Sequence, residues 1–478
     1  MFNVDRDADT VCALSTAPGI GGIAVLRVSG AGAWDMVRPL ASSLPSLPES
    51  HRAYYCVIRD PENNEPIDEV LVTYFEKGRS FTGEQTVEVS CHGGQQVSQD
   101  VLTLIQRQGA RLADRGEFTY RAFMNGRIDL MQAEAVLSLI ESQNPKVARL
   151  SLRQLQGDLS RSIEEVIESL TWVMAHLEAN IDFASEDIEV ADVSALLSGV
   201  CQSQLKVSAL VESYRAGQIV RDGLVVALVG PPNVGKSSLL NTLVGYERAI
   251  VTHLPGTTRD TVSERVSIEG VPIQFVDTAG LRETEDLVEK IGIEKTRQAV
   301  VDSDVLLAVV DLSEPNIVEL LGALELAIGK EVGLIFNKSD LRSAKGGLTA
   351  KAAVDKVFGK EMNSALKAWL DEIPEDRIFL ASAKSGEGIN EIKQFLHGMS
   401  HAEQSDGSAI VLQARHQEQL VIVNQALERA IDLLEKNASP EFVLEELMLA
   451  LRSLNELLGR RFDDEVMDRV FNEFCLGK

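Results

Sequence analysis

The sequence of 478 residues has few cysteines, few aromatic residues and no long apolar segment. No two of its five cysteines form a CxxC pair, which excludes a zinc ribbon and a disulfide framework and is typical of a reducing compartment. Apolar runs such as 224–229 and 305–310 are far too short to span a bilayer. The first ten residues, MFNVDRDADT, resemble neither a signal peptide nor a transit peptide. We therefore expect a cytoplasmic protein with no membrane partner.

Positive charge is also scarce, because 46 Lys and Arg stand against 72 Asp and Glu, for a formal net charge of −26. No large basic surface can cover such a molecule. A nucleic-acid partner would therefore need a local basic patch or a second protein that carries the phosphate contacts. The hydrophobic share of 45% and the charged share of 25% are those of a globular chain, and the length suggests about three domains.

Three patterns follow one another along the chain. The first alternates short β-branched runs with glycine and proline, which predicts an α/β domain with a mostly antiparallel sheet. The second has apolar residues at helical spacing, and it returns near the C-terminus. Between its two parts, short apolar strands alternate with helices, as in a parallel sheet covered on both faces. We predict an α/β multidomain protein with an N-terminal domain at 1–125, a helical domain at 126–220 and 399–478, and an α/β domain inserted at 221–398.

Residues 230–238, GPPNVGKSS, lie between a predicted strand and a predicted helix. They match the pattern GxxxxGK[ST] in the strand–loop–helix setting that this pattern requires. Its glycines let backbone N–H groups surround phosphates, Lys236 reaches the outer phosphates, and the Ser237 hydroxyl can ligate magnesium. A chance glycine-rich turn is a poor explanation for this combination.

Further motifs follow in the order that a GTP-binding domain requires. An aspartate in DTAG, at 277–280, can hold magnesium through water, and the loop GTTRD at 256–260 supplies a threonine that senses the terminal phosphate. The Asp340 carboxylate in NKSD accepts hydrogen bonds from the N–H edge of guanine, which adenine does not offer, and SAK at 382–384 supports the base with an amide. The predicted GTP-binding residues are Asn233, Val234, Gly235, Lys236, Ser237, Ser238, Gly256, Thr257, Thr258, Asp277, Thr278, Ala279, Gly280, Asn337, Lys338, Asp340, Ser382, Ala383 and Lys384, with Ser237 and Thr258 assigned to magnesium.

Leu281 follows DTAG at the position where many small GTPases carry a glutamine that orients the attacking water. A hydrocarbon side chain cannot orient water. Either the domain hydrolyses GTP poorly, or another residue and another positive charge take over. The carboxylates nearby in the sequence are Glu283, Glu285, Asp286 and Glu289, and periodicity does not choose among them.

The segments outside these motifs are more specific. TAPGIGGIAVLRVSG, SFTGEQTVEVSCHGG, RGEFTYRAFMNGRIDLMQAEAV and the C-terminal LLGRRFDDEVMDRVFNEFCLGK resemble the tRNA modification GTPases of the MnmE (TrmE) family, and the resemblance covers the whole chain. It implies an N-terminal folate-binding α/β domain, a helical domain built from both flanks and an inserted Ras-like P-loop GTPase domain. It also implies a homodimer joined mainly through the N-terminal domains.

The same resemblance implies a reaction on tRNA. Together with an FAD-dependent partner, MnmG, such proteins add an aminomethyl or carboxymethylaminomethyl group to carbon 5 of the wobble uridine of certain tRNAs. A tetrahydrofolate derivative similar to 5-formyltetrahydrofolate carries the one-carbon unit. The partner can then supply much of the tRNA-binding surface, which agrees with the negative net charge of this chain.

The resemblance also assigns roles in GTP hydrolysis. Glu289 corresponds to the glutamate that orients the catalytic water, which resolves the gap at Leu281. Four positions correspond to ligands of a potassium ion, which provides the positive charge that other GTPases take from an arginine. These potassium positions are Asn233, Thr252, Leu254 and Thr257, and the GTP-binding set gains Thr252, His253, Leu254 and Pro255.

Four further residues correspond to folate-contacting positions of the family: Arg27, Glu84, Arg127 and the terminal Lys478. Arginine and lysine suit the glutamate tail of a folate, because charged donors bind carboxylates strongly. From the residues alone, the preferred interpretation of Arg27 is an ordinary surface arginine beside a strand.

Two other functions stay open. One is a regulatory GTPase that acts as a ribosome-assembly or RNA-binding module, although the sequence has no GXXG loop in the setting of a KH domain. The other is a folate-dependent aminomethyltransferase in which the GTPase domain merely regulates. Folate binding by a chain without its GTPase domain would separate these cases.

Overall fold

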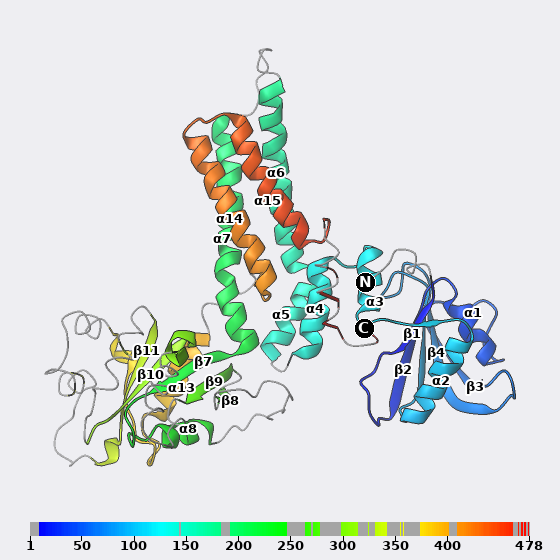
Figure 1. Cartoon of the computed structure of the whole chain (residues 1–478), viewed down its shortest axis with the longest axis horizontal. Coiled ribbons are helices and arrows are strands. Elements are labelled where there is room, and N and C mark those ends of the chain that lie inside the picture. Colours follow the sequence, from blue (N-terminus) through cyan, green and yellow to red (C-terminus); the bar gives the residue numbers. More distant parts are fainter. Residues whose placement is uncertain are drawn as a thin grey trace, which may run out of the picture. The chain divides into compact units, whose positions relative to one another are not determined.

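The computed structural model (Figure 1) describes residues 9–142, 145–182, 192–245, 263–268, 271–277, 298–313, 330–341, 373–400 and 409–461, together with 324, 354, 357, 467, 470–471, 473–474 and 477. The chain folds as two compact units. The first comprises residues 1–141, 148–211 and 415–478, and the second comprises residues 142–147 and 212–414.

The N-terminal part of the first unit is a six-stranded sheet in the order β3-β4-β5-β2-β1-β6. Neighbouring strands are antiparallel except for β1 and β6, which confirms the predicted, mostly antiparallel sheet. The strands are β1 (Val11–Leu14), β2 (Ile23–Ser29), β3 (Arg52–Arg59), β4 (Pro66–Phe75), β5 (Thr86–His92) and β6 (Arg111–Leu112).

One face of this sheet carries the core. Helices α1 (Ala33–Val37) and α2 (Gln95–Arg107) cover it, as Figure 1 shows, and a short 3-10 helix η2 (Arg38–Leu40) follows α1. Side chains alternate between the two faces of a strand, so every second residue lies on the other side. That second face exposes Ile23, Tyr55 and Leu71 by 68%, 65% and 48%, and it is therefore an open, partly apolar sheet face.

Helices from both flanks of the predicted GTPase domain pack together in the first unit. Helix α15 from the C-terminal part packs against α6, and Gln204 on α7 donates a hydrogen bond to Asn424 on α14. This confirms the expected helical domain made from both flanks. The helices, of which residues 145–147, 212–222 and 414 belong to the second unit, are α3 (Glu117–Met124), α4 (Leu130–Glu141), α5 (Pro145–Leu155), α6 (Asp158–Asp182), α7 (Val193–Asp222), α14 (Ala414–Glu435) and α15 (Pro440–Leu457).

The second unit is built on another six-stranded sheet, in the order β12-β11-β10-β7-β9-β8. Only β8 and β9 pair antiparallel. The strands are β7 (Leu224–Val229), β8 (Ser263–Ile268), β9 (Val271–Asp277), β10 (Val305–Asp311), β11 (Glu331–Asn337) and β12 (Ile378–Leu380).

Both faces of this second sheet are covered. Along β7, Val226 and Leu228 belong to one apolar cluster and Ala227 and Val229 to another. This explains why β7, β10 and β12 are almost wholly apolar and confirms the predicted parallel sheet. The remaining helices of this unit within the described ranges are α8 (Lys236–Val244), α13 (Ile389–Ser400), η4 (Ser339–Leu341) and η5 (Glu375–Arg377).

No helix in the described ranges is long and apolar enough to cross a membrane. The domain boundaries placed at residues 125, 220 and 398 remain predictions, because the first unit holds the N-terminal sheet and the long helices together.

Candidate functional site

A tight loop at 230–235 joins β7 to α8. A Cβ atom on Gly230 would lie 2.2 Å from the carbonyl oxygen of Val309, and one on Gly235 would lie 2.5 Å from Asn337 Nδ2. Asn233 and Gly235 also have φ angles of 65° and 92°, a left-handed conformation that favours glycine. Side chains would therefore block this loop at two of its positions, and the glycines let the backbone turn into the first turn of α8.

Lys236, the first residue of α8, lies within this loop. Its Nζ donates hydrogen bonds to the carbonyls of Gly230 and Pro231 at 2.6 and 2.8 Å, and the residue is only 7% exposed. The exposed Ser237 and Ser238 follow in the same helical turn. An ammonium group at a helix N-terminus suits an anion, and the Ser237 hydroxyl is a hard oxygen donor of the kind that completes a magnesium shell with phosphate oxygens.

Asn337 ends β11 and joins two separate loops. Its Nδ2 donates to the carbonyl oxygen of Val234 at 2.8 Å, and its Oδ1 accepts from the backbone N–H of Ala383 at 3.1 Å. The residue is 1% exposed. The amide of Asn337 therefore fixes the phosphate loop to the SAK segment through one buried side chain.

Asp340 and Ser382, which the sequence assigns to guanine, are in contact. Ser382 Oγ donates to Asp340 Oδ1 at 2.7 Å. Lys338 pairs through its Nζ with Asp311 at 2.6 Å, and Lys384 is exposed. Burial alone would raise the pKa of Asp311, but the hydrogen bonds from Lys338 and Ser313 outweigh it and lower that pKa. The two predicted base-recognition segments thus lie together at the carboxyl ends of β11 and β12, where open α/β sheets bind ligands.

Asp277 ends β9, whose backbone pairs with that of β7 at Leu228. Outside the described residues lie Thr252, His253, Leu254, Pro255, Gly256, Thr257, Thr258, Thr278, Ala279, Gly280 and the predicted catalytic Glu289.

Three of the four predicted folate residues lie around one loop, between β4 and β5 in the first unit. Glu84 belongs to this loop. The Arg27 guanidinium lies 5.4 Å from the ring centroid of Phe81 in the same loop, and it also bonds to Glu88 at 2.8 and 3.0 Å. A Cβ on Gly83 would lie 3.0 Å from Arg127 Cγ, so the Arg127 side chain passes close to the loop.

The C-terminal end approaches the same strands. Gly477 has a φ of 90°, and a Cβ there would lie 2.1 Å from the carbonyl oxygen of Leu14 at the end of β1. Leu14 is paired with Leu26, the neighbour of Arg27. Lys478 itself is outside the described residues, but the residue before it lies against the strand next to Arg27.

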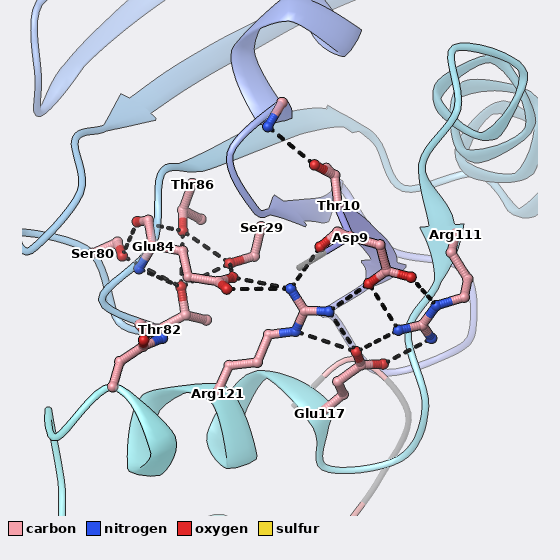
Figure 2. A network of polar contacts seen from close by, with 12 residues as sticks. Asp9, Thr10, Ser29, Ser80, Thr82, Glu84, Thr86, Arg111, Glu117 and Arg121 are labelled. Atoms are coloured by element: carbon pink, nitrogen blue, oxygen red, sulfur yellow. Dashed lines mark hydrogen bonds and ion pairs between the residues drawn. The ribbon is translucent and has the colours of Figure 1, made fainter. Parts of the chain in front are cut away.

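Sequence reasoning missed the residue that supports Glu84. Arg121 on α3 is 2% exposed and donates to the Glu84 carboxylate, as well as to Asp9 and Glu117 (Figure 2). The signal in the sequence that could have indicated this residue is an arginine within the otherwise largely uncharged helix EFTYRAFM.

A cavity of about 460 Å³ adjoins Arg127. Asp129 and Gln132 lie on its wall and exchange backbone-to-side-chain hydrogen bonds of 2.9 and 2.8 Å, which form a capping box at the start of α4. This cap fixes where the chain leaves the Arg127 segment and becomes helical.

A parallel sheet with a glycine loop after β7, a buried lysine in that loop and two adjoining base-recognition segments defines the class of P-loop GTP-binding proteins. Residues 10–127 match the family model "GTP-binding protein TrmE N-terminus", and residues 130–475 match "MnmE helical domain". The chain belongs to the MnmE family of tRNA modification GTPases, and it is therefore a GTP-hydrolysing enzyme.

Individual relatives agree along the full length. The tRNA modification GTPase MnmE of Bdellovibrio bacteriovorus is 43% identical and matches over 100% of this chain and 99% of its own. The tRNA modification GTPase MnmE of Natranaerobius thermophilus is 38% identical and matches over 98% of this chain and 99% of its own. Among solved structures, the G domain of the T. maritima FeoB iron transporter is 27% identical over 37% of this chain and 98% of that chain, with a TM-score of 0.24.

Proposed function

We propose that this GTPase, with an FAD-dependent partner of the MnmG type, adds an aminomethyl-type group to carbon 5 of the wobble uridine of certain tRNAs. The observation that carries the proposal is the gathering of Arg27, Glu84 and Arg127 around one loop of the first unit. The GTPase motifs would not require such a cluster. Family membership supports the same reaction.

The charged groups of this cluster fit a reduced folate. Glu84 is 17% exposed and offers a carboxylate to the N–H edge of a pterin ring, while Arg127 is exposed and can pair with a carboxylate of the glutamate tail, as Lys478 would. Arg27 is held by Glu88 and lies 5.4 and 5.5 Å from the Phe81 and Phe118 ring centroids. A 5-formyltetrahydrofolate-like molecule would supply the one-carbon unit when bound.

In GTP hydrolysis, Lys236 binds the outer phosphates, Ser237 and Thr258 hold magnesium, and Glu289 orients the water. Magnesium and potassium supply positive charge beside the reacting phosphate when bound. We assign potassium to Asn233, Thr252, Leu254 and Thr257. The support within the described residues is Asn233, which is exposed at the phosphate loop and carries an amide oxygen suited to a large cation. Hydrolysis is then expected to rise as two GTPase domains associate.

A homodimer through the N-terminal domains would use the open sheet face. Ile23, Tyr55 and Leu71 are exposed apolar side chains on this face, and an exposed apolar patch is typical of an interaction site. Arg27 lies on the same face of β2 as Ile23, four residues further along, so the dimer contact would adjoin the folate cluster. We place the protein in the cytoplasm and expect the partner to make many of the tRNA contacts, since this chain has a net charge of −26.

The proposed reaction is tested by mass spectrometry of wobble nucleosides from cells with and without this protein. Loss of the modified uridines is expected, with recovery by the wild type and not by Glu84→Gln. Unchanged nucleosides would contradict the proposal, and a changed ribosomal subunit profile with unchanged nucleosides would favour an RNA-binding regulatory GTPase instead.

The potassium proposal is tested by GTP turnover in potassium and in sodium at matched ionic strength. Turnover should rise steeply in potassium and far less in sodium, and Asn233→Ala should lose this response. Asn241→Ala is the matched control, because it makes the same change at an exposed position of α8 outside the loop. Equal rates in the two salts would remove the potassium site.

A further inference from the structure

Glu84 is held by two donors (Figure 2). Ser29 Oγ donates to its Oε2 at 2.7 Å, and Arg121 Nη1 donates to Oε1 and Oε2 at 3.3 and 3.2 Å. The loop backbone is held as well, since the Glu84 N–H donates to Thr82 Oγ1 at 3.2 Å and the Glu84 carbonyl accepts from Ser80. The carboxylate is therefore fixed in direction but still reaches solvent, at 17% exposure.

Arg121 uses its full set of donors inside the protein. Beyond Glu84, Nη1 donates to the Asp9 carbonyl at 2.8 Å, Nη2 donates to Asp9 and Glu117 at 2.9 and 2.8 Å, and Nε donates to Glu117 at 3.2 Å. At 2% exposure and with a planar, rigid fork, the guanidinium has no N–H group left for a ligand. Arg121 thus acts on the Glu84 carboxylate and not on a bound molecule.

Arg111 is the second arginine of the network, and it offers a comparison. It pairs with Asp9 and Glu117, each at 2.7 Å, but no described contact joins it to Glu84. Burial alone would raise the pKa of Asp9 and of Glu117, yet the hydrogen bonds from the arginines outweigh it and lower both. The two arginines thus balance two ionised carboxylates, and Glu84 is the third carboxylate, the one that can serve a ligand.

We infer that Arg121 is a positioning residue for ligand recognition: it fixes the direction of the Glu84 carboxylate, so that the acceptor capacity left beside Ser29 and Arg121 meets an N–H donor of the ligand. This inference rests on the proposed folate site. The 2-amino group of a reduced pterin is such a donor, and a hydrogen bond to a carboxylate that already accepts from internal donors requires a fixed carboxylate direction. A site built to hydrogen-bond a ligand group strongly rejects an analogue that lacks this group, because a polar group of the site is then left unpaired.

The experiment compares two ligands on the full-length chain. Isothermal titration gives the Kd of 5-formyltetrahydrofolate and of its 2-desamino analogue. The ratio, which is the Kd of the analogue divided by the Kd of 5-formyltetrahydrofolate, measures recognition of the N–H edge. Arg121→Lys keeps the charge but removes the fork. Arg111→Lys is the matched control, since it makes the same change in the same network without a contact to Glu84.

Arg121→Lys is expected to weaken binding of the complete folate about tenfold or more and to reduce the ratio by a similar factor. Arg111→Lys should leave the ratio unchanged. In a Glu84→Gln background, Arg121→Lys should have no further effect on the ratio, because its action passes through that carboxylate. GTP turnover of each variant checks that the chain is folded.

If Arg121→Lys does not fold, Ser29→Ala tests whether the donors to Glu84 position its carboxylate for the ligand. It removes the second donor to Glu84, leaves both arginines in place and should reduce the ratio in the same direction. An unchanged ratio in Arg121→Lys, an equal loss in both lysine variants, or a loss that persists with Glu84→Gln would overturn the inference alone. A wild-type chain that binds neither ligand would overturn the folate proposal and this inference with it.

Discussion

Asn337→Ala should uncouple the phosphate loop from the SAK segment. The variant loses the 2.8 Å bond to the Val234 carbonyl and the 3.1 Å bond from the Ala383 N–H. An unpaired buried polar group costs about 1–3 kcal/mol. The carbonyl of Val234, a residue that is 3% exposed, bears this cost in full. The N–H of Ala383 bears only part of it, because this residue is half-buried and water can replace the lost hydrogen bond. The two losses together come to about 2–4 kcal/mol.

Most of this cost should appear in nucleotide binding. Each loop keeps another anchor, since Thr242 Oγ1 still donates to the Ala383 carbonyl at 3.0 Å and Lys236 still bonds to Gly230 and Pro231. The fold should therefore persist, while the loops no longer hold their nucleotide-binding arrangement without a ligand. At one factor of ten per 1.4 kcal/mol, we expect GTP affinity to fall by roughly 30- to 1000-fold.

The assay is titration with a fluorescent GTP analogue, together with the apparent melting temperature without nucleotide. Ser339→Ala is the control in the same segment, because it loses a 2.7 Å bond to Glu387 but that hydroxyl contacts neither Val234 nor Ala383. Its affinity should stay near that of the wild type. If Asn337→Ala bound GTP as tightly as Ser339→Ala, the amide bridge would have no part in holding the site.

Three further predictions concern single carboxylates. Asp340→Asn should weaken GTP binding and favour xanthine nucleotides, because its carboxylate accepts from the guanine N–H edge; unchanged GTP and xanthosine triphosphate affinities would refute this. Glu289→Ala should lower GTP turnover with little change in Kd, and equal losses in both would mean that the residue holds the switch segment instead. Burial alone would raise the pKa of Glu134, but His416 and Arg415 lower it to about 2, below its usual value of 4.5. The stability that Glu134 contributes is therefore present above pH 4.5 and is lost as the pH falls towards 2. The apparent melting temperature of Glu134→Gln should lie below that of the wild type at neutral pH and should approach it in acid.

The sequence by itself determined the class of this protein. The order of GPPNVGKSS, NKSD and SAK and the apolar strands between them predict a parallel-sheet GTPase domain, because these features depend on local spacing and on strand burial. Helical periodicity on both sides of that domain likewise predicts the helices that pack in the first unit. Glu289 and Lys478, by contrast, stay assigned through family resemblance alone, since they lie outside the described residues.

Only the tertiary structure decided what holds the sites in shape. Asn337 meets Val234 across 103 positions of sequence, and Arg121 meets Asp9 across 112. Nothing local marks such pairs, because a partly polar helix such as EFTYRAFM has the same pattern whether its arginine faces water or the interior. The burial of Arg121 follows from the way α3 packs beside β1 and the loop before β5. A buried guanidinium must satisfy its donors there, and Glu84 becomes one of its acceptors for that reason.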